Sequence, residues 1–523
     1  MKFLITKTEI ERDYDNNCTN IHLFGRDENG ADDHKVVRNM EPHFYVRESD
    51  VAGREGDYLG RDGVIGFDYD VERTVFGTGE PLVKVRLDGP GSWNDAQDVF
   101  TETFGGDMNL ADVLRIESGI YVWAEVPDRE FLSEDEIKPV EEIPEDEPDL
   151  RIITLDIEVD DRGAFPSAGE KRITSIVAHD SYDGEYVGFI DGDGRDIHKM
   201  FPNGKPEEVD LLHVDSNERE MLIRFSSWVS EKNADVMSGW NYTGFDAPYL
   251  IARMEAVGAN PARLSPMGRA YVARNGDPKI RGVTQYDLLT AYKKNSWGEL
   301  RSYSLDYVAG EELGASKLSH EEGYFEMFET NPELLIDYNA RDVRLTVGID
   351  EKAGVIAFRD TLRKQVGVDL DNTINNYQFV EMMARRKLHE RGELAATGEF
   401  SAGNDDGYEG AFVFDPYYGV ARNVVGIAVE SLYPWTMYML NASPETKISE
   451  ERARREGIPY SKAPNGVCFR LDRDGLFKQL VEDAIALKED YRTLRDNAPP
   501  NSPEEEMWAE KYQVAKTICN SIY

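Results

Sequence analysis

The apolar run RIITLDIEV at residues 151–159 determines what the middle of the chain can fold into. A short run rich in isoleucine, leucine and valine is typical of a strand buried in a sheet. It follows PVEEIPEDEPDL at residues 139–150, an acidic and proline-rich stretch that is typical of a linker. Strand-like and helix-like segments then alternate to about residue 350, which predicts an α/β layer.

The segments on either side follow other patterns. Residues 1–140 alternate apolar and polar positions in short runs such as NCTNIHLFGR, which predicts a strand-rich N-terminal domain. Residues 375–392, NNYQFVEMMARRKLHERG, have the apolar spacing of an amphipathic helix. Helical patterns at 476–495 and from residue 503 onward are separated by DNAPPNSP, which cannot continue a helix. Two helices around such a turn predict a helical hairpin.

Charge dominates the composition. The 523 residues include 100 acidic and 59 basic side chains, for a net charge of -41, and the acids are spread along the whole chain. Such a chain repels itself unless salt screens the charges, and in molar salt the screening length is about 3 Å. We interpret the composition as adaptation to a salty cytoplasm; the alternative is an acidic protein of an ordinary cell. Length alone suggests about three domains.

Two compositional features exclude other classes. The sequence has no run of 18 apolar residues, so no membrane-spanning segment is predicted. Cys18, Cys468 and Cys519 are far apart and form no CxxC pair, which argues against a zinc site or a disulfide framework. A reducing, cytoplasmic location is therefore expected.

Acidic side chains recur in a pattern that suits metal binding. Asp156 and Glu158 stand two apart on the predicted 151–159 strand, so both leave the same face. In a chain this acidic such a pair alone is weak evidence. Asp246 lies between apolar stretches in SGWNYTGFDAPYL. Tyr338 and Asp342 are four apart on an apolar-periodic helix, where a bound metal would offset the cost of burying an acid.

The order of these motifs resembles the exonuclease region of family B DNA polymerases. LDIEV, NYTGFD and YNARD match that family's three exonuclease motifs, and QYDLLTAY and RSYSLDYVAGEELG between the second and third resemble it too. The resemblance implies an RNase H-like 3′-5′ exonuclease domain over residues 146–350. By this resemblance, two Mg²⁺ or Mn²⁺ ions would be held by Asp156, Glu158, Asp246 and Asp342. Tyr338 would orient the attacking water, and Asn241 and Phe245 would position the 3′ end of DNA.

A second resemblance covers the polymerase half of the same family. Tyr408 to Ala411, YEGA, resembles the short segment between the two activities, where Tyr408 and Gly410 would contact the template strand. The sequence SLYP resembles the end of polymerase motif A, in which Tyr433 would pack beneath the sugar of a nucleotide. The family has a metal-binding aspartate three residues before this serine, and this chain has Ala428 there. Glu430 would share a strand face with Ala428 but lie about 7 Å along it.

The predicted helical hairpin resembles the fingers of the same family. By this resemblance, five side chains on its two helices would bind a deoxynucleoside triphosphate: Lys488, Arg492, Lys516, Asn520 and Tyr523. Lys488 stands where the family usually has arginine, so a bidentate phosphate contact would be lost. The family's third polymerase motif, an Asp-Thr-Asp hairpin, and the thumb do not occur in these 523 residues.

The expected architecture is therefore an α/β multidomain chain supplying the N-terminal two-thirds of an archaeal-type polymerase of halophilic character. Its parts would be a mixed-β domain (1–145), the exonuclease domain (146–350), inter-domain helices with a partial palm (351–475), and the fingers hairpin (476–523).

Three functions remain open. The first is a polymerase fragment with proofreading exonuclease, acting in replication or repair and completed by a second chain that carries the third motif and thumb. The second is an exonuclease with an inactive polymerase remnant, and the third is a non-catalytic DNA-binding subunit. Ala428 favours exonuclease chemistry for this chain alone. The expected partners are single-stranded 3′ ends and primer-template DNA, with a deoxynucleoside triphosphate as a further ligand and no membrane.

Overall fold

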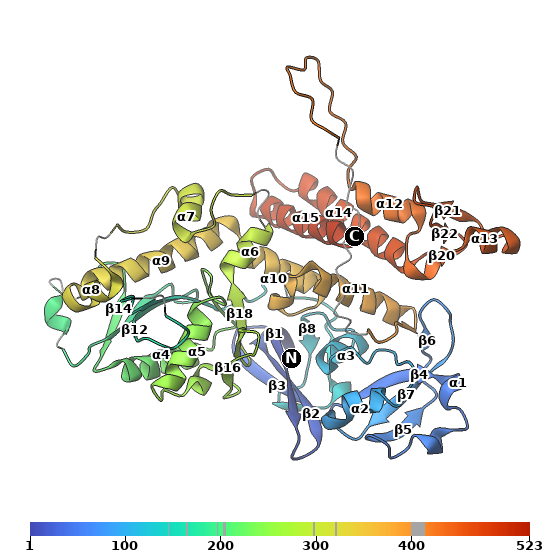
Figure 1. Ribbon diagram of the computed structural model, residues 1–523, viewed down its shortest axis with the longest axis horizontal. Coiled ribbons are helices and arrows are strands. Elements are labelled where there is room, and N and C mark those ends of the chain that lie inside the picture. Colours follow the sequence, from blue (N-terminus) through green and yellow to red (C-terminus); the bar gives the residue numbers. More distant parts are fainter. Residues whose placement is uncertain are drawn as a thin grey trace. The chain divides into compact units, whose positions relative to one another are not determined.

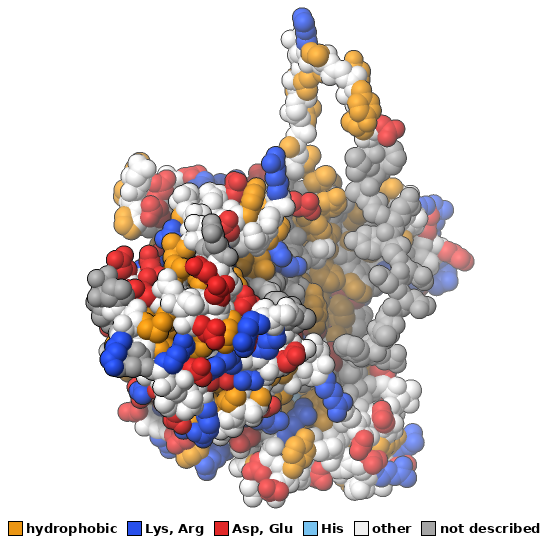
Figure 2. Space-filling model, turned by 60° about the vertical axis from the view of Figure 1, so that its left-hand side comes forward, with side chains coloured by type: hydrophobic (Ala, Val, Ile, Leu, Met, Phe, Trp, Pro, Cys, Tyr) orange, Lys and Arg blue, Asp and Glu red, His pale blue; other side chains and the backbone are white. Residues whose placement is uncertain are grey.

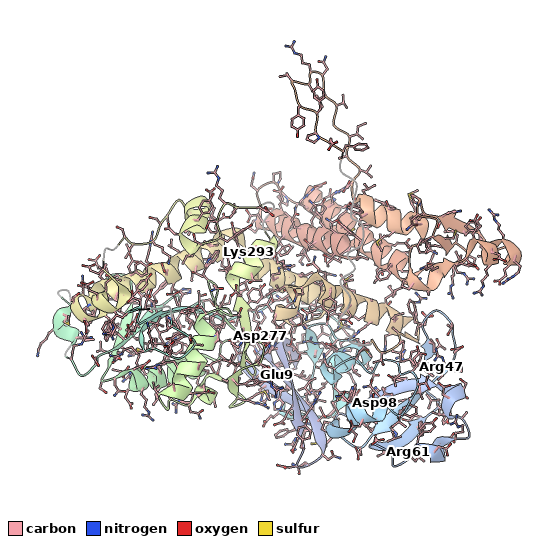
Figure 3. The ribbon with its side chains drawn as sticks, viewed as in Figure 1. Glu9, Arg47, Arg61, Asp98, Asp277 and Lys293 are labelled. Carbon is pink, nitrogen blue, oxygen red and sulfur yellow. The ribbon has the colours of Figure 1, made fainter. Side chains whose placement is uncertain are left out.

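The computed structural model describes residues 1–144, 146–163, 166–195, 197–201, 205–295, 299–319, 322–398 and 414–523 (Figure 1). The chain divides into two compact units, which we call unit 1 (Met1–Met40 and Leu110–Met382) and unit 2 (Glu41–Asn109 and Met383–Tyr523). In Figure 3, Glu9, Asp277 and Lys293 belong to unit 1, and Arg47, Arg61 and Asp98 belong to unit 2. These units group the chain differently from the four expected domains, whose boundaries remain proposals.

The first sheet of unit 1 carries the strand-rich pattern predicted near the N-terminus. Its strands lie in the order β10-β8-β1-β2-β3-β9. They are β1 (Lys2–Asp13), β2 (Cys18–Asp27), β3 (Asp32–Val37), β8 (Trp123–Glu125), β9 (Phe131–Leu132) and β10 (Lys138–Pro139). β1 and β2 pair antiparallel along their whole length with one register shift between Ile5 and Lys7. Phe3, Leu4 and Ile5 are fully buried, which anchors β1.

The second sheet of unit 1 contains the 151–159 run and confirms the predicted α/β layer. Its order is β14-β13-β12-β11-β15-β18. The strands are β11 (Ile152–Val159), β12 (Ile173–Asp180), β13 (Tyr186–Asp191), β14 (Leu211–Asp215), β15 (Val236–Gly239) and β18 (Thr284–Asp287). β11 pairs antiparallel with β12 and parallel with β15. Because β11 has a neighbour on each side and packing on both faces, apolar residues make up most of its sequence, and Asp156 and Glu158 are the two acids among them.

Helices cover both faces of this sheet (Figure 1). Ile153, Leu155 and Ile157 of β11 pack in one core cluster with residues of two helices, α4 and α5. The alternate side chains of β11, including Asp156 and Glu158, therefore face the opposite side, where α9 contacts β11 and β12. The helices of unit 1 are α3 (Leu110–Glu117), α4 (Glu218–Lys232), α5 (Asp246–Ala256), α6 (Leu288–Asn295), α7 (Leu305–Leu313), α8 (Tyr324–Thr330), α9 (Pro332–Ala353) and α10 (Val355–Val366).

Unit 2 combines small sheets with long helices. Its sheets are β4-β7-β5, β19-β6 and β20-β22-β21. The strands are β4 (His43–Arg47), β5 (Val64–Asp68), β6 (Thr74–Val75), β7 (Leu82–Leu87), β19 (Glu393–Leu394), β20 (Lys447–Ile448), β21 (Tyr460–Lys462) and β22 (Cys468–Arg470). Its helices are α1 (Glu48–Val51), α2 (Trp93–Gln97), α12 (Leu432–Leu440), α13 (Glu450–Glu456), α14 (Leu476–Asn497) and α15 (Pro503–Ser521), and α11 (Asn376–Glu390) spans the boundary between the units.

The predicted helices in the second half of the chain are confirmed. α11 matches the amphipathic segment at residues 375–392. α14 and α15 pack against each other as the expected hairpin, with the Tyr491 and Trp508 rings 5.8 Å apart. Pro499 and Pro500 lie between them, and Ser502 caps α15 by accepting a hydrogen bond from the Glu505 amide. None of the helices in the described part of the chain is long and apolar enough to cross a membrane.

The strand expected around Ala428 does not form. Residues 414–431 are described, and they contain no helix or strand. Val425 and Ile427 are 82% and 91% exposed. A strand needs a hydrogen-bonded neighbour, and none of the strands described in the structure pairs with this segment, so its β-type sequence is not enough.

Acidic and basic side chains are interspersed over the face seen in Figure 2. This surface distribution agrees with the spread of acidic residues along the sequence. Many of the acids lie in ion pairs, including buried ones such as Arg26–Asp235 at 2.7 Å.

Candidate functional site

Three of the predicted carboxylates converge in unit 1. Asp156 and Glu158 extend from the same face of β11, and Asp342 comes from α9, which packs over that face. One oxygen from each of the three lies within 4.8 Å of the others. Glu158 and Asp342 are buried and Asp156 is half-buried. The strand and the helix are both anchored in apolar cores, so the three groups are held together despite their like charge.

Asp246 lies beside this group but is not one of the three. It is the first residue of α5, where the N-terminal end of a helix favours a carboxylate. Its Oδ1 atom accepts a hydrogen bond of 3.2 Å from the Ile157 amide of β11. Its charge still contributes to the electrostatics of Asp156 and Glu158. Asp246 thus ties α5 to the strand that carries the site.

The electrostatics of the group favour a cation. Burial raises the pKa of Asp156 and of Glu158 well above their usual values, and neighbouring carboxylates raise both further. Burial likewise raises the pKa of Asp246 to about 8. A divalent cation would remove this repulsion, and clustered carboxylate oxygens are the ligands that Mg²⁺ and Mn²⁺ prefer. The residues present therefore fit a divalent metal.

Lys317 belongs to the site, and the sequence analysis missed it. Its Nζ atom donates to Asp342 Oδ2 at 2.5 Å and to the Tyr338 hydroxyl at 3.4 Å. Burial lowers the pKa of Lys317, but its acidic neighbours, led by Asp342, together outweigh burial and raise it, so the ammonium stays charged. Lys317 lies between α7 and α8, outside any helix or strand. No periodicity or spacing therefore marks it in the sequence.

Tyr338 occupies the expected face of α9. It is 4% exposed, and its hydroxyl lies 3.3 Å from the Tyr324 hydroxyl. Burial raises the pKa of Tyr338 to about 12, so it keeps its proton at neutral pH. Placed one helical turn before Asp342, the hydroxyl is able both to donate and to accept a hydrogen bond next to the carboxylate group.

Asn241 and Phe245 lie in the loop between β15 and α5. Asn241 is exposed and has a positive φ of 65°. Its carbonyl accepts hydrogen bonds from the Gly244 and Phe245 amides. A Cβ at Gly244 would come within 2.5 Å of Asn241 Oδ1, so a larger residue there would displace the Asn241 side chain. Asn241 is thus accessible shortly before Asp246, whereas Phe245 is half-buried, packs against the core cluster of the sheet and lies 5.4 Å from the Tyr249 ring.

A second charged group lies in unit 2, on the α14–α15 hairpin. Lys488 and Arg492 share a face of α14, as predicted, and Arg492 donates to the Tyr512 hydroxyl of α15 at 3.2 Å. Both cations contact Glu430, through Lys488 Nζ at 3.0 Å and Arg492 Nη2 at 2.5 Å. Glu430, the acid two residues after Ala428, is thus paired with the two cations of α14 in this structure.

The other predicted nucleotide-binding residues are partly brought together. The Tyr433 ring of α12 lies 4.8 Å from the Tyr523 ring. Lys516 and Asn520 lie one turn apart on α15 and are both half-buried. Tyr408 and Gly410, the predicted template contacts, lie outside the described residues.

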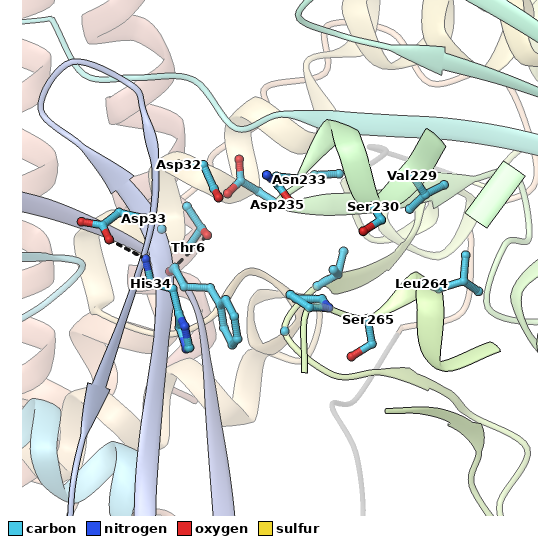
Figure 4. Close-up of a pocket in the computed structure, with 16 residues that line it drawn as sticks. Thr6, Asp32, Asp33, His34, Val229, Ser230, Asn233, Asp235, Leu264 and Ser265 are labelled. Carbon is cyan, nitrogen blue, oxygen red and sulfur yellow. Dashed lines mark hydrogen bonds between the residues drawn. The ribbon is translucent and has the colours of Figure 1, made fainter. Parts of the chain in front are cut away.

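A separate recess of about 120 Å³ lies between β1–β3 and the α4–β15 turn of unit 1 (Figure 4). Its wall carries Asp32, Asp33 and Asp235. Asp235 is already bonded to Arg26 and to the Arg151 amide. None of the three carboxylates near α9 lines this recess, so it is not part of the metal-binding group.

Two protein-family models match this chain, one in the region of the carboxylate group and one in the region of the α14–α15 hairpin. The model described as DNA polymerase family B, exonuclease domain, matches residues 127–308, and the model of DNA polymerase family B matches residues 373–523. The first range includes Asp156, Glu158 and Asp246 and ends before α9, which carries Asp342. The second range includes the α14–α15 hairpin. Together the two models match more than half of the chain.

Relatives and a solved structure extend the match. The DNA-directed DNA polymerase of Escherichia phage RB69 is 27% identical over 67% of this chain and 43% of that protein. The DNA polymerase of Thermococcus litoralis is 28% identical over 69% of this chain and 22% of that protein. The matched stretch thus spans less than half the length of either relative.

The family B DNA polymerase of the archaeon Pyrobaculum calidifontis shares the fold, with a TM-score of 0.82 at 24% identity, over 100% of this chain and 68% of that one. Exonuclease and polymerase models of one family match this chain in their expected order, and its relatives are archaeal and phage polymerases. The chain therefore belongs to the family B DNA polymerases.

Proposed function

We propose that this chain is the exonuclease-bearing part of a family B DNA polymerase, and that by itself it shortens single-stranded 3′ ends rather than extending them. The convergence of Asp156, Glu158 and Asp342 within 4.8 Å carries the proposal. The polymerase region has Ala428 where a metal-binding acid is needed, and its neighbour Glu430 is held by two cations.

The carboxylate group would hold Mg²⁺ or Mn²⁺, with two ions expected. Asp156, Glu158 and Asp342 would be direct ligands, and Asp246 would either join them or hold β11 through the Ile157 amide. When bound, such ions activate water and stabilise the charge on a leaving 3′ oxygen. The protein contributes a rigid group of oxygens on a strand and a helix.

The surrounding side chains would bind and orient the substrate. Tyr338 would position the attacking water through its neutral hydroxyl. Lys317 would hold Asp342 in place and offer its positive charge to the phosphate that is cleaved. The ring of Phe245 would stack on a terminal base, and Asn241 would hydrogen-bond the 3′ nucleotide. The reaction is hydrolysis of a phosphodiester, which releases a nucleoside monophosphate.

The polymerase region would retain a binding role. Tyr433, Lys488, Arg492, Lys516, Asn520 and Tyr523 would contact a deoxynucleoside triphosphate, and Tyr408 and Gly410 would contact the template. Synthesis would need acids that Ala428 does not supply and a further palm and thumb, which a second chain would carry. We further propose that the polymerase is of archaeal type, is adapted to high salt and is cytoplasmic. It would act in DNA replication or repair.

The test is digestion of a 3′-terminal single-stranded DNA in Mg²⁺ or Mn²⁺ at high salt. The parent chain should shorten it from the 3′ end, and Asp156→Ala should abolish shortening. Asp277→Ala, which removes an exposed acid of the same unit before β17 (Pro278–Ile280), serves as the matched control and should digest like the parent. Equal digestion by the parent and Asp156→Ala would refute the assigned exonuclease site, and no digestion by either would favour the non-catalytic DNA-binding subunit.

A further inference from the structure

A carboxylate already occupies the cation group of the α14–α15 hairpin. Glu430 Oε1 accepts hydrogen bonds from Lys488 Nζ at 3.0 Å and from Arg492 Nη2 at 2.5 Å. Lys488 also donates to Ser431 Oγ at 3.2 Å. Two consecutive residues thus supply oxygens that accept hydrogen bonds from these cations, as the oxygens of a phosphate can.

The need for this carboxylate comes from burial of the lysine. The Lys488 side chain is only 4% exposed, and a buried ammonium is costly unless an anion accompanies it. Glu489 is more distant from Lys488, at 3.8 Å, and its closer contact is with Arg492 at 3.1 Å. Glu430 is therefore the main counter-charge of Lys488 in this structure.

The two acids differ in how firmly they are held. Glu489 belongs to α14 itself, so its backbone is held by the helix that also carries Lys488 and Arg492. The Glu430 side chain is 61% exposed and comes from a described segment, residues 414–431, that forms no helix or strand. Few backbone contacts oppose its departure, so it can exchange with another anion.

We propose that Glu430 is an internal competitor for the anionic ligand of α14. Its carboxylate neutralises Lys488 and Arg492 while the hairpin is empty, and a triphosphate must displace it to reach them. The inference rests on the proposed nucleotide role of these two cations. It assigns to Glu430 a positioning role that sets the affinity of the region for polyphosphate.

The competition has two consequences. A triphosphate carries more negative charge than one carboxylate, so it wins at sufficient concentration but with reduced affinity. The Glu430 side chain is 61% exposed, so molar salt screens its charge, and the difference made by Glu430 should shrink as salt rises.

The experiment is a calorimetric titration of the full chain with inorganic tripolyphosphate, with EDTA present so that the carboxylate group of unit 1 takes no part. At about 0.1 M salt, Glu430→Gln should bind the probe about fivefold more tightly than the parent, the scale of one exposed ion pair. Glu489→Gln removes the same charge from the same cations and should change affinity by less than about twofold. Arg492→Gln should weaken binding.

Each outcome decides something. Equal binding by the parent and Glu430→Gln, with Arg492→Gln weaker, would overturn the competition and leave the triphosphate site standing. A Glu489→Gln gain as large as that of Glu430→Gln would mean that net charge alone is responsible. Binding that does not depend on Arg492 would refute the triphosphate site and the competition together. A helical circular dichroism spectrum and a melting temperature like those of the parent show that each variant has folded.

Discussion

The carboxylate group of unit 1 and the cation group of unit 2 are electrostatic opposites built on different supports. In unit 1, three acids face one lysine, Lys317, and the negative excess remains. In unit 2, Lys488 and Arg492 face Glu430 and Glu489, and the charges nearly cancel. The first group is carried by a central strand and a long helix, whereas Glu430 comes from a segment without regular structure.

The comparison of the two groups shows where a folded chain can hold like charges close together. Repelling carboxylates stay together only when packing fixes their backbones, because otherwise they would move apart or take up protons. Burial and mutual repulsion raise the pKa of Asp156 and Glu158, so the group in unit 1 needs a cation to be fully ionised. The group in unit 2 meets its own demand, and a ligand has to compete for it.

The largest expected effect on 3′ digestion comes from removing one carboxylate of unit 1, and the same change in unit 2 is its comparison. Glu158→Gln should lower the rate of 3′ digestion by about a thousandfold, because a metal-binding oxygen is lost. Glu430→Gln makes the same chemical change in unit 2 and should leave the digestion rate within about twofold. Rates on a single-stranded DNA at saturating Mg²⁺ measure both. Similar losses in the two variants would break the contrast.

A smaller effect is expected for the lysine of unit 1. Lys317→Met should slow digestion by about thirtyfold, since a charged hydrogen bond to Asp342 and a positive charge near the phosphate are lost. Lys352→Met, at an exposed lysine on the same α9 helix, is the matched control and should behave like the parent. If Lys317→Met digests at the parent rate, the lysine is only a structural partner of Asp342.

The contrast between buried and exposed charge should also appear in stability. Asp180, fully buried at the end of β12, accepts hydrogen bonds from Arg151 and contacts Lys232 at 3.1 Å. Burial alone would raise its pKa, but the hydrogen bonds led by Arg151 outweigh burial and lower the pKa to about 2. Because the pKa of Asp180 is lower in the folded chain, its ionised carboxylate stabilises the fold at pH values above about 4, the pKa of the unfolded chain. This stabilisation is lost as the pH falls towards 2.

Asp180→Asn should therefore lower the free energy of unfolding by about 2 kcal/mol at pH 7, with the difference vanishing near pH 2. Denaturant unfolding across pH measures it. Glu450→Gln, which removes a partly exposed acid of α13 from its pairs with Arg454 and Lys462, is the comparison and should change the free energy of unfolding at pH 7 by less than about half as much. A pH-independent loss for Asp180→Asn would contradict the assigned pKa.

The sequence predicted best where local periodicity decides the outcome. The two-residue spacing of Asp156 and Glu158 fixed their common face, and the four-residue spacing fixed Tyr338 and Asp342 on α9. The helices of the α14–α15 hairpin followed from apolar spacing and the prolines between them. In each case the signal lies within one strand or one helix, so no long-range contact had to be known.

What the sequence did not predict depends on distant partners. Lys317 lies outside regular structure and meets Asp342 only after folding. The strand expected around Ala428 needs neighbouring strands, and the described structure has none beside it. The hydrogen bond from the Ile157 amide to Asp246 joins residues 89 apart. The pairing of Glu430 with Lys488 and Arg492 likewise spans about sixty residues.

The contrast between the two regions is tested most directly by giving one chain both kinds of substrate. A labelled primer-template is incubated with the chain, Mg²⁺ and all four deoxynucleoside triphosphates, and the length of the primer is followed. The account predicts shortening from the 3′ end in the parent, no shortening in Asp156→Ala, and no extension in either. Templated extension of the primer by this chain alone would contradict it.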